Sequence, residues 1–149
     1  MLMDIVVARA KPIDAGLMAA LHQSCFPRPW DAAAMATFIA APDGLCLLGS
    51  VNAGDAPSGF LIASKAADEA ELLTLAVMPD RRRLGLGKAL LQSAMAALAA
   101  SGANQLFLEV EDGNEAALQL YRSLGAVPVG RRARYYEHGA DAAIFRLAL

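Results

Sequence analysis

Arg82-Arg83-Leu84-Gly85-Leu86-Gly87 joins an apolar run, residues 72–77, to an amphipathic run that begins near Lys88. The first run is typical of a strand and the second of a helix, so the six residues are expected to form a strand-to-helix turn. The first amides of a helix have no intrahelical acceptor, and two glycines let a bulky anion approach the backbone. The helix dipole and three cationic side chains add positive charge there. The pattern predicts a phosphate-binding loop.

The glycine spacing matches neither of the two commonest phosphate loops. Leu90 stands where the dinucleotide fingerprint has its third glycine, and Arg82 stands where the Walker A pattern has its first. The loop is therefore expected to hold a phosphorylated ligand in another way. A structural alternative stays open, in which Gly85 and Gly87 only allow a strand and a helix to pack closely.

The length of 149 residues predicts one domain, residues 1–149, large enough to bury a core without disulfides or metal. No apolar stretch is long enough to span a bilayer and the first residues lack a basic region, so a cytoplasmic protein without membrane contact is expected. Cys25, Cys46, His22 and His138 show no metal-ligand spacing, so no metal is expected. The net charge of -2 argues against nucleic acid as the main partner.

Hydrophobic periodicity and turn residues predict the remaining elements. Helices are expected to begin after Asp14 and Asp31, with each aspartate as the N-terminal cap. A first strand is expected at residues 5–9, and strands at residues 45–51, 59–66 and 69–77 are expected to form an antiparallel meander. After the loop, helices are expected at residues 87–100 and 114–124, ended by Gly102 and Gly125, followed by a hairpin at residues 127–136 and 142–149.

Residues 105–111 alternate with a period of two, which is typical of a strand. One face carries Leu106, Leu108 and Val110, and the other carries Phe107, Glu109 and Glu111. Two carboxylates therefore share a face with an aromatic ring. Residues 69–111 read as strand, loop, helix and strand, which is a βαβ unit. The sheet is therefore expected to be mixed, with helices on both faces.

These features resemble the GCN5-related N-acetyltransferase (GNAT) superfamily, whose phosphate loop begins with Gln or Arg and ends in Gly-x-Gly or Gly-x-Ala. Arg82, Gly85 and Gly87 match that pattern. Further segments are similar to the ribosomal-protein-alanine N-acetyltransferases of the RimI type: Pro29-Trp30, Ala70-Glu71-Leu72-Leu73, Leu108-Glu109-Val110, Asn114, Ala117, Leu120-Tyr121, Leu124-Gly125, Tyr135-Tyr136 and Asp141-Ala142. The resemblance implies a single-domain α/β (α+β) fold, with a mixed, mostly antiparallel, twisted sheet, helices on both faces and a central βαβ acetyl-CoA-binding unit.

The resemblance also implies acetyl-CoA as the cosubstrate. Backbone amides of the loop would hold its pyrophosphate, and the main chain before the loop would pair with the pantetheine arm. Asn114 matches a family position that contacts the same ligand. The implied acetyl-CoA-binding residues are Leu75, Ala76, Val77, Arg82, Arg83, Leu84, Gly85, Leu86, Gly87, Lys88 and Asn114.

Glu109 matches the family's proton acceptor, and Tyr121 matches its proton donor. Acetyl transfer to an amine needs both roles, because the attacking amine loses a proton and the leaving sulfur gains one. Each residue has a structural alternative. Glu109 and Glu111 can form a solvated sheet face, and Tyr121 can be a core residue on an amphipathic helix.

Trp30, Glu71, Tyr135 and Tyr136 are the candidates for the acceptor groove, again by resemblance. Trp30 has the alternative role of a core side chain between the first two helices. Arg134 replaces the asparagine that usually precedes the paired tyrosines, and this departure bears on the identity of the substrate.

The implied function is acetyl transfer to a protein N-terminal amine by direct attack in a ternary complex, with the N-terminal alanine of a small-subunit ribosomal protein as the acceptor. Two alternatives stay open. One is an acetyltransferase of the same fold that acts on a lysine or a small-molecule amine, and the other is a non-catalytic acyl-CoA-binding or assembly subunit. A protein or peptide N-terminus is the expected partner, and a monomer or weak dimer is the expected state.

Overall fold

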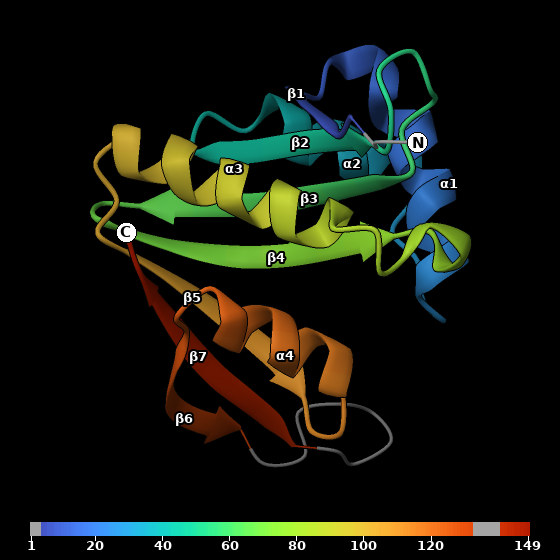
Figure 1. Cartoon of the computed structure of the whole chain (residues 1–149). Coiled ribbons are helices and arrows are strands. Elements are labelled where there is room, and N and C mark those ends of the chain that lie inside the picture. Colours follow the sequence, from blue (N-terminus) through green and yellow to red (C-terminus); the bar gives the residue numbers. More distant parts are fainter. Residues whose placement is uncertain (1–3, 133–140) are drawn as a thin grey trace.

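The structure is a computed structural model that describes residues 4–132 and 141–149. Its strands are β1 (Val6–Arg9), β2 (Gly44–Ser50), β3 (Gly59–Ala66), β4 (Glu69–Val77), β5 (Gln105–Glu111), β6 (Val127–Arg132) and β7 (Ala142–Ala148). Within the described residues they form one sheet of seven strands in the order β1-β2-β3-β4-β5-β7-β6 (Figure 1).

The strand pairing is mostly antiparallel, as predicted. β2 to β4 form the expected meander, and β1 adds to it by pairing antiparallel with β2. The strands predicted at residues 59–66, 69–77 and 105–111 are confirmed at those bounds. β4 and β5 are parallel, which makes the sheet mixed. β7 lies between β5 and β6 and pairs antiparallel with both, so the last strand of the chain is internal to the sheet.

Helices cover both faces of the sheet, which confirms the predicted layers (Figure 1). α1 (Ala15–Cys25) and α2 (Ala32–Ala40) pack on one face, against side chains such as Cys46 and Phe60. α3 (Leu86–Ala100) and α4 (Glu115–Ser123) share the other face and a larger core, which includes Leu106 and Leu108 of β5. None of the described helices has the length and hydropathy needed to cross a lipid bilayer.

The caps of the first two helices differ from each other. Asp31 caps α2 as predicted, because its carboxylate accepts a hydrogen bond from Ala34 N at 2.9 Å. The cap predicted at Asp14 is wrong. The Asp14 carboxylate instead accepts from Lys11 N at 2.7 Å, which closes the 3-10 turn η1 (Pro12–Asp14) ahead of α1.

Two strand glycines bring the start of α3 close to the sheet. A Cβ atom at Gly49 would lie 2.7 Å from Leu86 Cδ1, and a Cβ at Gly59 would lie 2.9 Å from Ala76 O. Leu86 and Leu90 occupy the space that these missing side chains leave, and both are fully buried. The first turn of α3 is therefore fixed over β2 and β3, and this holds the preceding loop in place.

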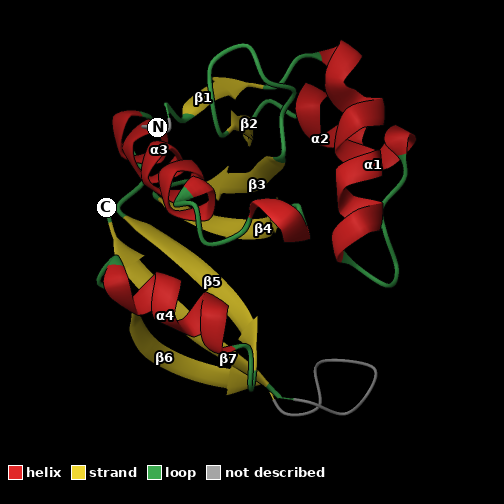
Figure 2. Cartoon of the chain, turned by 45° about the vertical axis from the view of Figure 1, so that its right-hand side comes forward, coloured by secondary structure: helices red, strands yellow, loops and turns green. Residues whose placement is uncertain are grey.

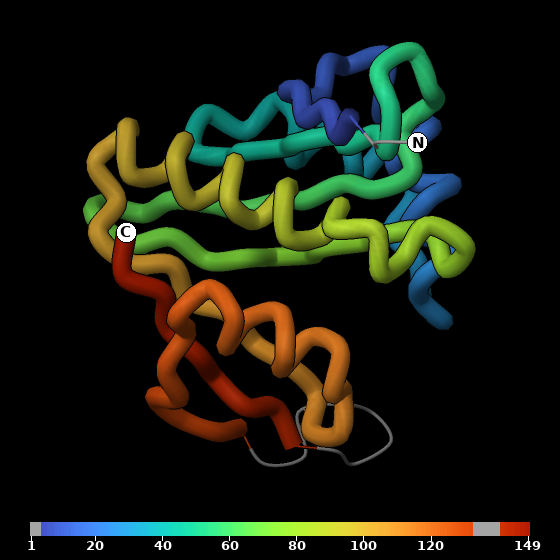
Figure 3. The backbone as a smooth tube through the Cα atoms, in the orientation of Figure 1, coloured from blue at the N-terminus to red at the C-terminus, as the bar shows by residue number. Residues whose placement is uncertain are grey.

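β4 and β5 are paired over only three residues each, residues 69–71 with residues 105–107. Beyond these pairs the two strands diverge, as Figure 2 shows. A β-bulge at Leu73 lies where the divergence begins, because Ala63 pairs with Leu72 while the adjacent Ile62 pairs with Thr74. Figure 3 shows that the backbone from β5 onward turns away from the meander.

Candidate active site

The predicted phosphate loop links β4 to α3, as expected. It begins with the 3-10 turn η2 (Pro79–Arg81) and reaches α3 at its N-cap, Gly85. Gly85 has a φ of 88° and Arg83 a φ of 63°, so two residues of the loop are left-handed. The first helical bond runs from Ala89 N to Gly85 O at 3.0 Å. The preceding amides, at residues 86–88, therefore lack an acceptor inside the helix and are available to an anion.

The alternative that the two glycines serve only close packing is not supported at Gly87. A Cβ atom there would lie 3.6 Å from Leu120 Cδ2 and 3.8 Å from Val77 Cγ2, which are ordinary contact distances. At Gly85 a side chain would also have room, but the positive φ disfavours one. Packing therefore does not require a glycine at position 87, and the loop fits a ligand whose phosphates approach the backbone.

Successive residues of β4 direct their main-chain N–H and C=O groups alternately toward β3 and toward the side where β4 and β5 diverge. Met78 N donates to Ser58 O at 2.8 Å, so Met78 faces β3. Neighbouring residues of a strand point their N–H and C=O groups to opposite sides, so Ala76 also faces β3. Leu75 and Val77 face away from β3, toward the side where β5 has departed. Of the three residues predicted to pair with a pantetheine arm, Ala76 is thus turned to the wrong side.

The Val77 carbonyl oxygen is already engaged by the chain itself. It accepts hydrogen bonds from Arg82 Nε at 3.0 Å and from Cys25 Sγ at 3.4 Å. These contacts tie the predicted loop and the end of α1 to the last residue of β4. They also leave the Val77 N–H, rather than its C=O, as the group available to a ligand.

Glu109 lies on the face of β5 opposite α3 and α4, as the alternation predicted. Its side chain is 19% exposed, and Oε1 lies 3.1 Å from Nη1 of Arg132 on β6. Sequence reasoning missed this ion pair, because it depends on β7 entering the sheet between β5 and β6.

Tyr121 lies on α4 and is 6% exposed, within the core that α3 and α4 share. Glu109 and Tyr121 therefore belong to opposite faces of the sheet. Both side chains can approach one atom only where the sheet is interrupted. The divergence of β4 and β5 is such an interruption, and the predicted loop lies at the β4 side of it.

The remaining predicted residues have different surroundings. The Asn114 side chain accepts from Ala117 N at 3.3 Å, so it serves as the N-cap of α4. Glu71 is exposed at the last residue pair between β4 and β5. Tyr135 and Tyr136, together with Arg134, lie outside the described residues.

Trp30 has the packing role that the sequence left open. Its ring lies 4.8 Å from the His22 ring and 5.0 Å from the Phe38 ring, which places it between α1 and α2. Trp30 N also donates to His22 Nδ1 at 3.0 Å. The His22 ring is stacked on its other neighbour, Phe26, at 4.3 Å. Any contact of Trp30 with an acceptor substrate would therefore be made at the edge of this aromatic cluster.

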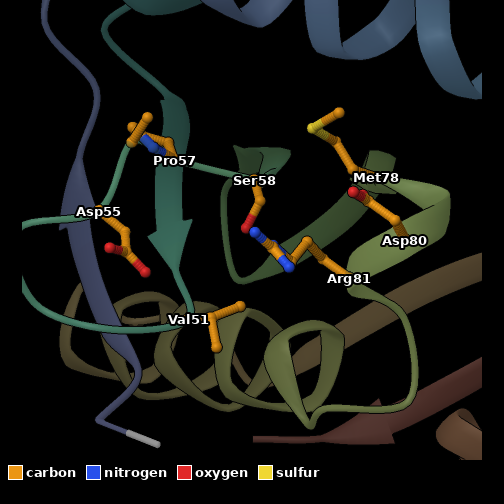
Figure 4. Close-up of a pocket in the computed structure, with 8 residues that line it drawn as sticks. Val51, Asp55, Pro57, Ser58, Met78, Asp80 and Arg81 are labelled. Atoms are coloured by element: carbon orange, nitrogen blue, oxygen red, sulfur yellow. The ribbon is translucent and has the colours of Figure 1, made fainter.

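Two hollows of the surface lie apart from the predicted catalytic residues. The first, about 340 Å³, lies beside η2 and is lined by residues including Ser58, Asp80 and Arg81 (Figure 4). The second, about 360 Å³, lies between α4 and β6 and is lined by residues including Leu118 and Arg131. Neither has Glu109 or Tyr121 in its lining. Across the described ranges, His, Cys, Asp and Glu side chains form no cluster of three suited to a metal ion.

Known proteins of one family are similar to this chain. The family model described as "Acetyltransferase (GNAT) family" matches residues 17–126. The ribosomal protein bS18 alanine N-acetyltransferase of Escherichia coli is 43% identical over 79 residues, which are 53% of this chain and 53% of that protein. The aligned part of the chain thus spans about half the length of this curated relative.

Solved structures extend the similarity over almost the whole chain. The crystal structure of the ribosomal-protein-S18-alanine N-acetyltransferase from Escherichia coli has a TM-score of 0.86 and 31% identity, and the match covers 97% of this chain and 94% of that one. Arabidopsis thaliana NAA60 in complex with acetyl-CoA has a TM-score of 0.87 at 19% identity, covering 98% of this chain and 100% of that one, which indicates the shared fold alone.

Proposed function

The chain belongs to the acetyltransferase (GNAT) family, and we propose that it transfers an acetyl group from acetyl-CoA to the α-amino group of a protein N-terminus. The observation that carries the proposal is the match over 97% of this chain to an enzyme named for acetylating the alanine of ribosomal protein S18. The N-terminal alanine of a small-subunit ribosomal protein is therefore the proposed acceptor.

The loop before α3 suits the diphosphate of acetyl-CoA. Its left-handed residues, Arg83 and Gly85, lie just before the amides at the start of α3. Three cationic side chains, Arg82, Arg83 and Lys88, surround these amides in the sequence. Backbone donors, helix dipole and formal charge thus favour an anion at one place. In this proposal residues 82–88 hold the diphosphate.

The unpaired side of β4 suits the pantetheine arm. Leu75 and Val77 direct main-chain groups toward the divergence, and an extended ligand with amides can pair with them as a strand would. The N–H of one of these residues is also a donor for the carbonyl oxygen at which negative charge develops. Ala76 has no part in this pairing, because its main chain faces β3.

Proton transfer is assigned to Glu109 and Tyr121. The thioester supplies the acetyl group: the amine nitrogen bonds to its carbonyl carbon as the carbon–sulfur bond breaks, giving an amide and a thiol. Glu109 takes the proton that the amine loses, and Tyr121 gives the proton that the sulfur gains. Exchange with water then restores both side chains. A phenol, with an ordinary pKa of about 10, is protonated at neutral pH and can hydrogen-bond the sulfur.

An N-terminal amine is the acceptor class that a single carboxylate serves best. Freeing the base form at neutral pH costs about 1 kcal/mol for an α-amino group and about 4.5 kcal/mol for a lysine side chain. A carboxylate that acts directly or through water is sufficient for the first.

The test compares peptides with a free and with a blocked N-terminus, using the Glu109→Gln and Tyr121→Phe variants alongside the unaltered protein. We expect acetylation of the free α-amine only, and a fall in kcat of about 10²-fold or more for each variant with acetyl-CoA binding retained. Activity that survives N-terminal blocking would indicate a lysine or small-amine acceptor. Unchanged turnover in both variants would refute the assigned proton transfers.

A further inference from the structure

We propose that Arg132 is a positioning residue, which holds the Glu109 carboxylate in the orientation that accepts the proton of the attacking amine. This inference rests on the proposed function of Glu109. Its basis is the ion pair between Arg132 Nη1 and Glu109 Oε1, at 3.1 Å. An ion pair of this kind restricts the orientation of a carboxylate, and that orientation otherwise varies.

The strand order brings the two side chains together. Arg132 is paired with Ala142 of β7, and Glu109 is paired with Ile144 of the same strand. Arg132 therefore reaches diagonally across β7 to contact a residue two strands away. Ala142 is small and fully buried, so it leaves room for the arginine to pass. A larger side chain at that position would block this path.

The two oxygens of Glu109 have different roles in this proposal. Oε1 is the oxygen in contact with the guanidinium of Arg132, and Oε2 is the oxygen that takes the proton of the amine. The Glu109 side chain is 19% exposed, whereas that of Arg132 is 54% exposed. The arginine thus approaches from the solvent side and holds a carboxylate that is itself mostly covered. Its effect on the reaction passes through Glu109, and Arg132 contacts neither the acceptor nor the acetyl group in this proposal.

The neighbouring arginine provides a matched control. Arg131 is 55% exposed, close to the value for Arg132, but its side chain lies on the opposite face of β6. It pairs there with Asp112 and Asp141, away from Glu109. Both arginines lie on β6, carry the same charge and are exposed to a similar degree. They differ in that they lie on opposite faces of the strand.

The experiment measures initial rates on a peptide with a free N-terminal alanine, with Arg132→Gln, Arg132→Lys and Arg131→Gln each made in the unaltered protein. For Arg132→Gln we expect a fall in kcat of about 10-fold or more, with the KM for acetyl-CoA within about twofold. Arg132→Lys should restore part of kcat, and added methylguanidine should raise the rate of Arg132→Gln. Arg131→Gln should keep kcat within about twofold. Thermal unfolding tests whether each variant is folded, and calorimetric titration tests whether it binds acetyl-CoA.

The double variant Glu109→Gln, Arg132→Gln isolates the dependence on Glu109. We expect the double variant to match Glu109→Gln alone, because a positioning residue has nothing to position once its target is gone. A loss from Arg132→Gln that is equally large in the Glu109→Gln background would overturn the proposal, and so would equal rates for Arg132→Gln and Arg131→Gln. These results leave the role of Glu109 intact. Full activity of Glu109→Gln would instead overturn both proposals together.

Discussion

His22 is a buried titratable side chain that has no role in the proposed chemistry. It is 3% exposed and its ring is stacked between Phe26 and Trp30. Nδ1 accepts the Trp30 N–H, which requires the neutral ring with its proton on Nε2. Burial lowers the pKa of His22 from its ordinary value of 6.5. Protonation would both charge a buried group and remove the acceptor for Trp30.

The folded protein should therefore lose stability on mild acidification through His22. The unfolded chain takes up this proton at a higher pH than the folded chain, so the contribution is complete above pH 6.5 and declines as the pH falls through the folded pKa. The slope from this one group cannot exceed about 1.4 kcal/mol per pH unit. Urea unfolding at about pH 7.5 and about pH 5.5 measures the free energy of unfolding at each.

His22→Asn is the informative variant for this prediction. Its amide oxygen can replace Nδ1 as the acceptor for Trp30 N and does not titrate. We expect a lower stability overall, because the ring stacking is lost, but a smaller difference between the two pH values. An equal difference in both proteins would assign the acid sensitivity to other groups.

Some features of the site follow from local sequence patterns, and others depend on the assembled sheet. The face of Glu109 was predicted, because strand alternation is a local rule. The orientation of the Ala76 main chain toward β3 depends on which residues of β4 form hydrogen bonds with β3. The contact between Arg132 and Glu109 depends on the order of the strands. Both are properties of the assembled sheet, so the sequence alone did not reveal them.

The turn before α3 depends on the conformation of Gly85, the N-cap of that helix. Its φ of 88° is costly for any residue with a Cβ, although a Cβ would meet only Ile5 Cδ1, at 3.7 Å. Gly85→Ala should therefore lower the free energy of unfolding by about 1–2 kcal/mol and weaken acetyl-CoA binding, because the amides after it are displaced. Chemical denaturation and calorimetric titration measure the two effects.

Gly16 provides the control for that substitution. It lies in the first turn of α1 without a positive φ, and a Cβ atom added there would meet no other atom within 4 Å. Gly16→Ala is expected to leave acetyl-CoA binding unchanged and to keep or slightly raise stability. Similar losses in both variants would mean that the left-handed geometry at Gly85 has no special importance.

The elements themselves were largely predictable, and the exceptions have physical causes. Strands at residues 59–66 and 69–77 follow from apolar runs bounded by turn residues. Asp14 carries the signal of a helix cap, but a proline turn competes for its carboxylate. The place of β7 between β5 and β6 has no local signal, because a hairpin pattern is the same whichever strand lies outside.

At the scale of the whole molecule, the limited pairing of β4 with β5 makes ligand binding a source of stability. Only residues 69–71 of β4 pair with β5, so a ligand along the rest of the strand adds contacts that the free protein lacks. Acetyl-CoA at about 100 times its Kd should raise the free energy of unfolding by about 2.7 kcal/mol. Thermal unfolding with and without acetyl-CoA measures this shift.

A short acetyl thioester without the diphosphate is the matched ligand for that measurement. It offers the reactive group but nothing for the loop at residues 82–88 to bind. We expect it to shift the unfolding temperature little at the same concentration. An equal shift by both compounds would contradict the assignment of the loop to the diphosphate.

The placement of Glu109 and Tyr121 on opposite faces of the sheet has a kinetic consequence. In the proposed mechanism, a peptide would reach Glu109 and a nucleotide thioester would reach Tyr121 from different sides of one layer. With separate routes of entry, neither ligand would have to bind first, and initial rates at varied concentrations of both substrates measure this. On the same reasoning, the acetylated peptide and the thiol would leave by different sides, and the release of one would not wait for the other.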